Sequence, residues 1–334
     1  MKIIQKVFAL LFKAAIAVLI VMSTTFGWIP TASVNLPSSQ SRHEISSYLS
    51  SVVHKLAGEI GTRNYRHYDR LEMAKDFIAQ EFEKSGYEVS YQTYSVNNQS
   101  FSNIIAAKGN ALEKNPLIIG AHYDSCFNPG ADDNGSAVAG MLSLARLLSK
   151  EKGIDRIVFV AFVNEEPPFF QTGTMGSRVF TKFLKEGNIK IQGAIVLEMI
   201  GYYSNDWFSQ KYLPLLGPFF PNKGNFVGIV GDFQSHKLVG KLAKGFKNAS
   251  RFPLRTIVAP RSIPGINFSD HWSFWQENYP AVMVTDTAYL RNKNYHQQTD
   301  LPETLNYEYM AEVVWGLRSA VLGLMSDVNA QGGN

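Results

Sequence analysis

The sequence predicts an α/β protein with a mixed, mostly parallel sheet and helices on both of its faces. Short runs that are apolar throughout, such as Ile157 to Val163, are typical of strands buried on both sides. Segments of helical length that are rich in Ala, Leu and Met, such as Ser136 to Leu148, lie between these runs. This alternation of buried strands and helices indicates a sheet covered on both faces.

The segment before the alternating pattern predicts two helices and two strands. From Arg42 onward, apolar residues are spaced so that they share one helical face. Asp69 can cap a second helix, which is predicted to end at Ser85-Gly86. Residues 88–96 alternate between polar and apolar side chains and predict a strand, and residues 103–107 predict another.

The remaining elements continue the alternation through one domain, predicted over residues 42–327. Strands are predicted at residues 116–120, 157–163, 194–197, 226–230 and 281–285. Helices are predicted at residues 136–148, 177–185, 237–246 and 307–324. Residues 202–224 are the least regular segment and are predicted to form an insertion over the sheet. Some of the aromatic side chains here and after Glu166 could line an apolar pocket, although packing is favoured for each: Phe169, Phe170, Trp207, Phe208, Tyr212, Phe219 and Phe220.

The N-terminus has the features of an export signal. Lys2, Lys6 and Lys13 flank an apolar stretch, and small residues follow at Thr31-Ala32-Ser33. Residues 1–33 are therefore predicted to be a signal peptide, followed by a linker over residues 34–41, so that the mature protein is periplasmic or extracellular. An uncleaved N-terminal anchor is the alternative, and only in that case is contact with a membrane expected.

Charge and cysteine content limit the partners and the bonds that the chain can use. The formal net charge is only +4 and no run of Lys or Arg stands out, so nucleic acid is not indicated as a partner. Cys126 is the single cysteine, which excludes an intramolecular disulfide. Its thiol could serve as a nucleophile or a ligand, but a small buried side chain is the favoured interpretation.

Acidic and imidazole side chains recur where the predicted strands end. His122, Glu165-Glu166 and Glu198 each end or follow an apolar run, and Asp132-Asp133 precedes a predicted helix. In open sheets of this kind, ligands bind beyond the carboxyl ends of the strands. Carboxylates and imidazoles are ligands that zinc recruits, and a crowd of carboxylates needs a cation to neutralise it. Each cluster also has a simpler explanation, such as helix capping by Asp132-Asp133; their joint recurrence favours a metal site.

Read together, the clusters resemble the co-catalytic zinc exopeptidases, family twenty-eight of the metallopeptidases. The resemblance covers residues from about 55 to 325 and rests on six motifs. These are Ala121-His122-Tyr123-Asp124-Ser125, Gly130-Ala131-Asp132-Asp133-Asn134-Gly135-Ser136, Glu165-Glu166, Leu197-Glu198-Met199, Ser269-Asp270-His271 and Tyr295-His296. The family includes secreted bacterial aminopeptidases, glutamate carboxypeptidases and glutaminyl cyclases. The resemblance implies a three-layer fold and an exported zinc exopeptidase acting on peptides.

The resemblance also implies a role for each matching residue. The implied metal ligands are His122, Asp133, Glu166, Glu198 and His296, with Asp133 bridging two zinc ions. Glu165 would be the general base, and Tyr295 would hydrogen-bond the oxyanion. Asp124 would support His122, and Asp270 and His271 would be supporting or substrate-facing residues. Glu198 departs from the family, whose two-zinc members usually carry Asp there, so two ions are expected but one is possible.

Three functions are consistent with these residues. An aminopeptidase that hydrolyses the N-terminal peptide bond is favoured, with carboxypeptidase activity left open. A glutaminyl cyclase of the same fold would use one zinc held by Asp133, Glu166 and His296, without His122. A non-catalytic domain that binds peptides or a partner would not need the adjacent pair Glu165-Glu166. The sequence does not indicate an oligomeric state.

Overall fold

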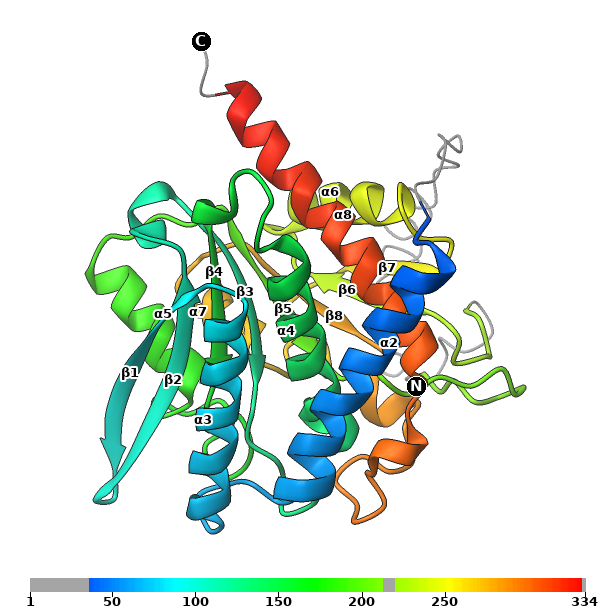
Figure 1. The fold of residues 1–334 in the computed structure, drawn as a ribbon, viewed down its shortest axis with the longest axis horizontal. Coiled ribbons are helices and arrows are strands. Elements are labelled where there is room, and N and C mark those ends of the chain that lie inside the picture. Colours follow the sequence, from blue (N-terminus) through cyan, green and yellow to red (C-terminus); the bar gives the residue numbers. More distant parts are fainter. Residues whose placement is uncertain (1–35, 213–219, 332–334) are drawn as a thin grey trace, which may run out of the picture.

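The computed structural model describes residues 36–212 and 220–331 (Figure 1). The helices are α2 (Ser39–Val53), α3 (Tyr68–Lys84), α4 (Ala137–Leu148), α5 (Gly176–Glu186), α6 (His236–Lys247), α7 (His271–Gln276) and α8 (Tyr307–Gln331). The strands are β1 (Glu88–Val96), β2 (Gln99–Ala107), β3 (Leu117–His122), β4 (Ile157–Phe162), β5 (Gly193–Glu198), β6 (Val227–Gly231), β7 (Leu254–Val258) and β8 (Ala281–Thr285). Short helical segments include η1 (His54–Ile60), η3 (Ala131–Ser136) and η6 (Ala288–Leu290).

The described strands form one mixed sheet of eight strands in the order β1-β2-β4-β3-β5-β8-β6-β7. The four central strands, β4, β3, β5 and β8, are parallel to one another. β2 runs antiparallel to β4, and β6 runs antiparallel to β8, so direction reverses on each side of the central group. The predicted α/β fold is confirmed, and the carboxyl ends of the four central strands meet at one edge.

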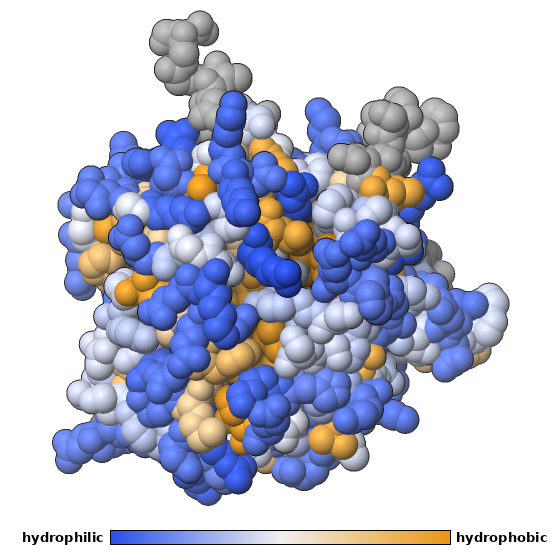
Figure 2. All heavy atoms as spheres, viewed as in Figure 1, coloured by the Kyte–Doolittle hydropathy of each residue, from blue (hydrophilic) through white to orange (hydrophobic). Residues whose placement is uncertain are grey.

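Helices cover both faces of the sheet. Side chains of α2, α3, α4, α6 and α8 pack on the face that carries Ile119, Phe159 and Ile195. α5 and α7 pack on the opposite face, against Ile118 and Val160. The alternation of neighbours between the two cores follows from the two-residue period of a strand. In Figure 1 the larger set of helices crosses in front of the sheet, and Figure 2 shows that the same face of the molecule is mostly hydrophilic at its surface.

Besides the short η segments, the sequence did not predict one strand, β7, and one α-helix, α7. β7 is an edge strand whose residues are mostly half-buried, and Arg255 and Thr256 interrupt its apolar character. α7 has six residues, too few for a helical period to be visible. In addition, α2 begins at Ser39, capped by Ser38 Oγ, so the helix starts inside the segment predicted to be a linker. The predicted leader, residues 1–33, lies outside the described residues. Within them, no helix combines the length and the apolar character that crossing a membrane requires.

Phe159 is expected to be a main contributor to stability because it is fully buried and its ring meets Phe82 and Tyr87 at 5.9 and 5.4 Å. Phe159→Ala should lower the free energy of unfolding by about 3–5 kcal/mol. Phe233 is 55% exposed, so Phe233→Ala should change it by about 0.5 kcal/mol or less. Denaturant titration of both variants checks this, and equal effects would contradict the described core.

Candidate metal centre

The predicted metal-binding side chains lie together at the edge of the sheet where the central strands end. His122 is the last residue of β3, Glu198 is the last residue of β5, and Glu166 follows β4. Asp133 lies in η3, directly before α4, and His296 lies in the segment after η6. The parallel strands therefore bring together residues that are far apart in the sequence, as expected for an open α/β sheet.

These residues form two groups that share Asp133. Ligand atoms of His122, Asp133 and Glu198 lie within 4.8 Å of one another. His122 Nε2 is 3.4 Å from Asp133 Oδ1 and 3.4 Å from Glu198 Oε2. In the other group, His296 Nε2 is 3.2 Å from Asp133 Oδ2 and 3.4 Å from Glu166 Oε2. Each oxygen of Asp133 thus faces one histidine, which is the arrangement that a carboxylate bridging two ions requires.

The donor set fits a divalent cation. Two buried polar atoms of the site, His122 Nε2 and Glu166 Oε1, have no hydrogen-bond partner within the described part of the chain. Such atoms are costly to bury unless a ligand satisfies them. Both are donor types that zinc accepts. The five candidate ligands are therefore suited to a metal ion.

The protonation of the acids supports this interpretation. Burial raises the pKa of Glu166 to about 7, with the Asp133 charge adding to it. Burial also raises the pKa of Glu165 well above its usual range, helped by Glu198 and Glu166. Burial alone would raise the pKa of Asp133, but His122 and His296 outweigh it and hold that pKa below its ordinary value. Without a cation, protons must neutralise the cluster, and a divalent ion would displace them.

Two buried carboxylates position the adjacent acids through the backbone. Asp124 Oδ1 and Oδ2 accept the amide protons of Glu165 and Glu166, at 3.2 and 3.1 Å. Its backbone carbonyl is 3.2 Å from His122 Nδ1, whereas its carboxylate is 3.5 Å away, so the predicted support of His122 comes at shorter range from the main chain. The carboxylate of Asp124 thus mainly holds the turn after β4.

Asp300 does the same for the Asp132-Asp133 pair. Its two oxygens accept the amide protons of Asp132 and Asp133, at 2.9 and 3.1 Å. Asp132 then turns to Gly201 N and Asn292 Nδ2, leaving Asp133 to face the histidines. Asp300 was not predicted, because a lone acid in a polar loop gives no sequence signal.

Arg63 is a second residue that the sequence analysis missed. Its fully buried guanidinium donates to the carbonyls of Tyr123, Pro129 and Gly130, which belong to the loop between β3 and η3. Gly130 has a φ of 64°, and a Cβ there would lie 2.4 Å from Asp133 O, so only glycine fits this turn. Arg63 and Gly130 therefore shape the loop that presents Asp133.

Glu198 reaches the metal centre, whereas Asp270 and His271 are buried beside it. Glu198 accepts a hydrogen bond from Ser269 Oγ at 2.7 Å while remaining close to His122, so the longer side chain still reaches the site. Asp270 is fully buried, and neither of its carboxylate oxygens has a hydrogen-bond partner among the residues described. His271 is buried, bonds Ile266 O at 2.7 Å, and has its pKa lowered to about 4 by burial. Its ring packs against Trp275 with centroids 4.5 Å apart, and its supporting or substrate-facing role stays a prediction.

An apolar cavity of about 320 Å³ opens beside the two groups. Tyr295 lines it, and its ring stacks on His296 with centroids 3.8 Å apart. Of the aromatic residues considered from the sequence, Phe170, Tyr212 and Phe220 also line it. Trp207 and Phe208 are instead 69% and 78% exposed, Phe169 packs on Tyr65 and Phe101, and Phe219 lies outside the described residues.

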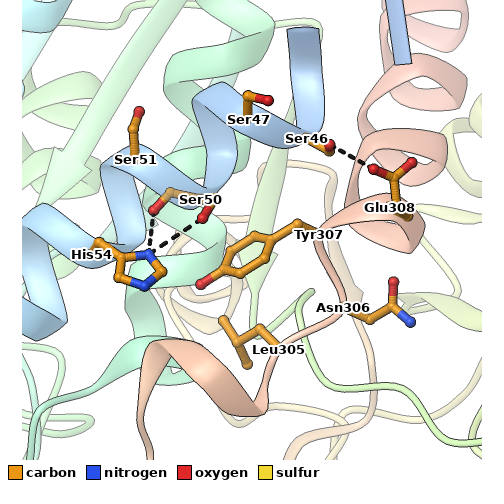
Figure 3. A pocket seen from close by; sticks show the side chains of 9 residues that line it. All are labelled: Ser46, Ser47, Ser50, Ser51, His54, Leu305, Asn306, Tyr307 and Glu308. Atoms are coloured by element: carbon orange, nitrogen blue, oxygen red, sulfur yellow. Dashed lines mark hydrogen bonds between the residues drawn. The ribbon is translucent and has the colours of Figure 1, made fainter. Parts of the chain in front are cut away.

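A larger cavity of about 680 Å³, lined by residues of α2, η1 and the start of α8, has different chemistry (Figure 3). Ser46, Ser47, Ser50 and Ser51 line it with His54. His54 Nδ1 lies 2.8 Å from the carbonyl of Ser50 in its own helix, closer than the Ser50 hydroxyl at 3.3 Å. This is a contact between successive helical turns, so we place the functional site at the smaller cavity beside the acids.

A sequence model of peptidase family M28 matches residues 103–321. The chain belongs to this family. Protein YfbL of Escherichia coli, which is uncharacterised, is 39% identical over 85% of this chain and 90% of its own length. The family predicted from the motifs is thereby confirmed. The chain spans about half the length of the leucine aminopeptidases that it also matches.

Two solved structures show which proteins share the fold of this M28 chain. The zinc aminopeptidase BSAP of Bacillus subtilis superposes with a TM-score of 0.65 at 15% identity, covering 83% of this chain and 94% of that one. Glutaminyl cyclase of Fimbriiglobus ruber superposes with a TM-score of 0.61 at 20% identity, covering 83% and 95%. Fold alone therefore does not distinguish a peptidase from a cyclase.

Zinc is expected to stabilise the folded protein through Asp133. At a free concentration one hundred times its Kd, one ion should add about 2.7 kcal/mol to the free energy of unfolding. Asp133→Asn should lose most of this gain because both groups lose a charged ligand. Asp155 is a surface acid, so Asp155→Asn should keep it. Thermal unfolding with zinc and with EDTA measures the difference, and an unchanged gain in Asp133→Asn would contradict the bridging position.

The stabilisation by zinc should grow as the pH rises from about 5 to about 8, because carboxylate ligands must lose their protons to bind metal. The stability of the metal-free protein should instead fall as the pH rises. A pKa of Glu166 raised to about 7 means that the folded state binds this proton more tightly than the unfolded state. That stabilisation is present at low pH and is lost as the pH rises through about 7. Unfolding temperatures with and without zinc across this range check both trends; a zinc effect that shrinks with pH would contradict them.

Proposed function

We propose that this M28 chain is a zinc-dependent aminopeptidase that hydrolyses the N-terminal peptide bond of peptides. The observation that carries the proposal is the pair of histidine–carboxylate groups joined by Asp133, with Glu165 beside them. Glu165 Oε2 is 3.8 Å from His122 Nε2, and the residue is 7% exposed. BSAP, a zinc enzyme of the same fold, supports zinc as the metal. Two ions per chain are proposed, one for each group.

When bound, the metal supplies Lewis-acid activation of water and of the scissile carbonyl. Glu165 accepts a proton from the attacking water and transfers it to the departing amine nitrogen, so that OH is added to the carbonyl carbon and H to the amine. Tyr295, on the wall of the cavity, donates a hydrogen bond to the developing oxyanion.

The charges of the cavity favour a substrate amine over a substrate carboxylate. Its described lining includes Asp133, Glu165, Glu166 and Glu198, but neither lysine nor arginine. A carboxypeptidase would need a cationic side chain for the C-terminal carboxylate of its substrate. The apolar remainder of the wall, with Phe170, Ile263, Ile266, Phe268 and Met283, accommodates a large apolar N-terminal side chain.

The group formed by His122, Asp133 and Glu198 favours hydrolysis over cyclisation. A single-zinc glutaminyl cyclase would need Asp133, Glu166 and His296, which leaves His122 without a role. Here His122 is fully buried and its Nε2 faces Asp133 and Glu198 without a hydrogen-bond partner among the described residues. A second ion explains this arrangement. Export of the enzyme is proposed from the leader-like residues 1–33 alone.

Glu165→Gln tests the proposal. The variant should retain zinc but lose about 10²–10⁴-fold in kcat on a leucine anilide, because only the general base is removed. Glu186 is an exposed acid at the end of α5, so Glu186→Gln should retain full activity. Elemental analysis accompanies the assay.

Normal turnover by Glu165→Gln would remove Glu165 from the mechanism. A glutaminyl peptide assayed in parallel tests the activity itself. Its conversion to a pyroglutamyl product, with the leucine anilide left intact, would replace the aminopeptidase with a cyclase.

A further inference from the structure

The single cysteine, Cys126, lies next to the group formed by Asp133, Glu166 and His296. Cys126 Sγ, a carboxylate oxygen of Glu166 and a ring nitrogen of His296 all lie within 4.8 Å of one another. The side chain of Cys126 is only partly buried. The favoured expectation from the sequence, a small buried side chain, therefore does not describe its position. Three donor types that bind zinc meet here: thiol, carboxylate and imidazole.

The carboxylate of Glu166 has a feature that points to a cation ligand between these donors. Glu166 is 3% exposed, and its Oε1 is buried without a hydrogen-bond partner among the described residues. Its Oε2 is already directed to His296, at 3.4 Å. The unpartnered oxygen therefore belongs to a carboxylate that faces the same donors. Leaving it unsatisfied would be costly, and a metal ion would satisfy it.

The loop that carries Cys126 is fixed to the loop that carries His296. Gln298 Nε2 donates to Phe127 O at 2.7 Å, and Asn128 Nδ2 donates to Gln297 O at 3.2 Å. The residues that follow the cysteine thus bond the residues that follow the histidine. These bonds hold the thiol and the imidazole in a fixed relation before any ion binds, which is what a preformed ligand set requires.

We propose that Cys126 is a thiolate ligand of the metal ion held by Glu166 and His296, with Asp133 shared with the other group. The inference rests on the metal centre of the proposed function. On binding, the thiol gives its proton to solvent and the sulfur lone pair is donated to the ion. A thiolate is a softer donor than oxygen, so this group selects zinc, cobalt or cadmium over magnesium or manganese. The His122 group has no sulfur ligand and is less selective.

Cobalt spectroscopy of the purified full-length protein tests the assignment. Cobalt(II) should produce a sulfur-to-metal charge-transfer absorption in the near ultraviolet that is lost in Cys126→Ser. The visible cobalt bands of the His122 group should persist in this variant, which shows that it is folded. Zinc should also slow the reaction of the only thiol with a disulfide reagent such as Ellman's reagent, and EDTA should restore the rate.

The outcomes separate this inference from the function on which it rests. If cobalt binds but the near-ultraviolet absorption is the same in wild type and Cys126→Ser, the thiolate assignment is overturned while the metal centre stands. If zinc binds but does not slow the reaction of the thiol with Ellman's reagent, the thiolate assignment is likewise overturned. If elemental analysis finds no metal bound to the wild type under any condition, both the metal centre and the thiolate ligand are overturned.

Discussion

Mutual repulsion among buried carboxylates is the constraint around which this molecule is organised. Asp133, Glu165, Glu166 and Glu198 are each less than a tenth exposed, and all line one cavity wall. Four negative charges at this density are unstable in a protein interior without positive charge between them. The two histidines provide part of that charge, and the geometry leaves room for cations to provide the rest. The parallel strands determine where the charges meet, since all the central strands end at the same edge.

The same hydrogen-bonding arrangement occurs twice and separates neighbouring acidic side chains. Asp124 and Asp300 each accept two consecutive backbone amide protons, which fixes the turn at a pair of adjacent acidic residues. Consecutive side chains then diverge: Glu165 faces His122 and Glu166 faces His296. Of the other pair, Asp133 faces both histidines, and Asp132 bonds Gly201 and Asn292. Both anchoring carboxylates are almost fully buried. The geometry of the centre therefore depends on residues that never touch the ion.

Local patterns in the sequence predicted the fold and the candidate ligands at strand ends, whereas Asp133 and His296 were assigned as ligands through the resemblance to the family. Apolar runs that end in His122, Glu165-Glu166 or Glu198 indicate strand ends directly. Contacts between distant loops could not be predicted from the sequence. Asp300 and Arg63 act on backbone atoms that have no sequence signature, and Cys126 has a neighbour in His296 only because two loops meet. β7 and α7 were missed for a different reason: one is an edge strand with a mixed pattern, and the other is too short to show a period.

The wide separation of the ligands along the chain has a consequence for metal acquisition. His122 is contributed by the third strand, whereas His296 follows the last one, so the coordination sphere is incomplete until the whole sheet has assembled. A partly folded chain offers an ion only scattered, weak donors. The identity of the bound metal is thus determined by the ions that are available where folding is completed.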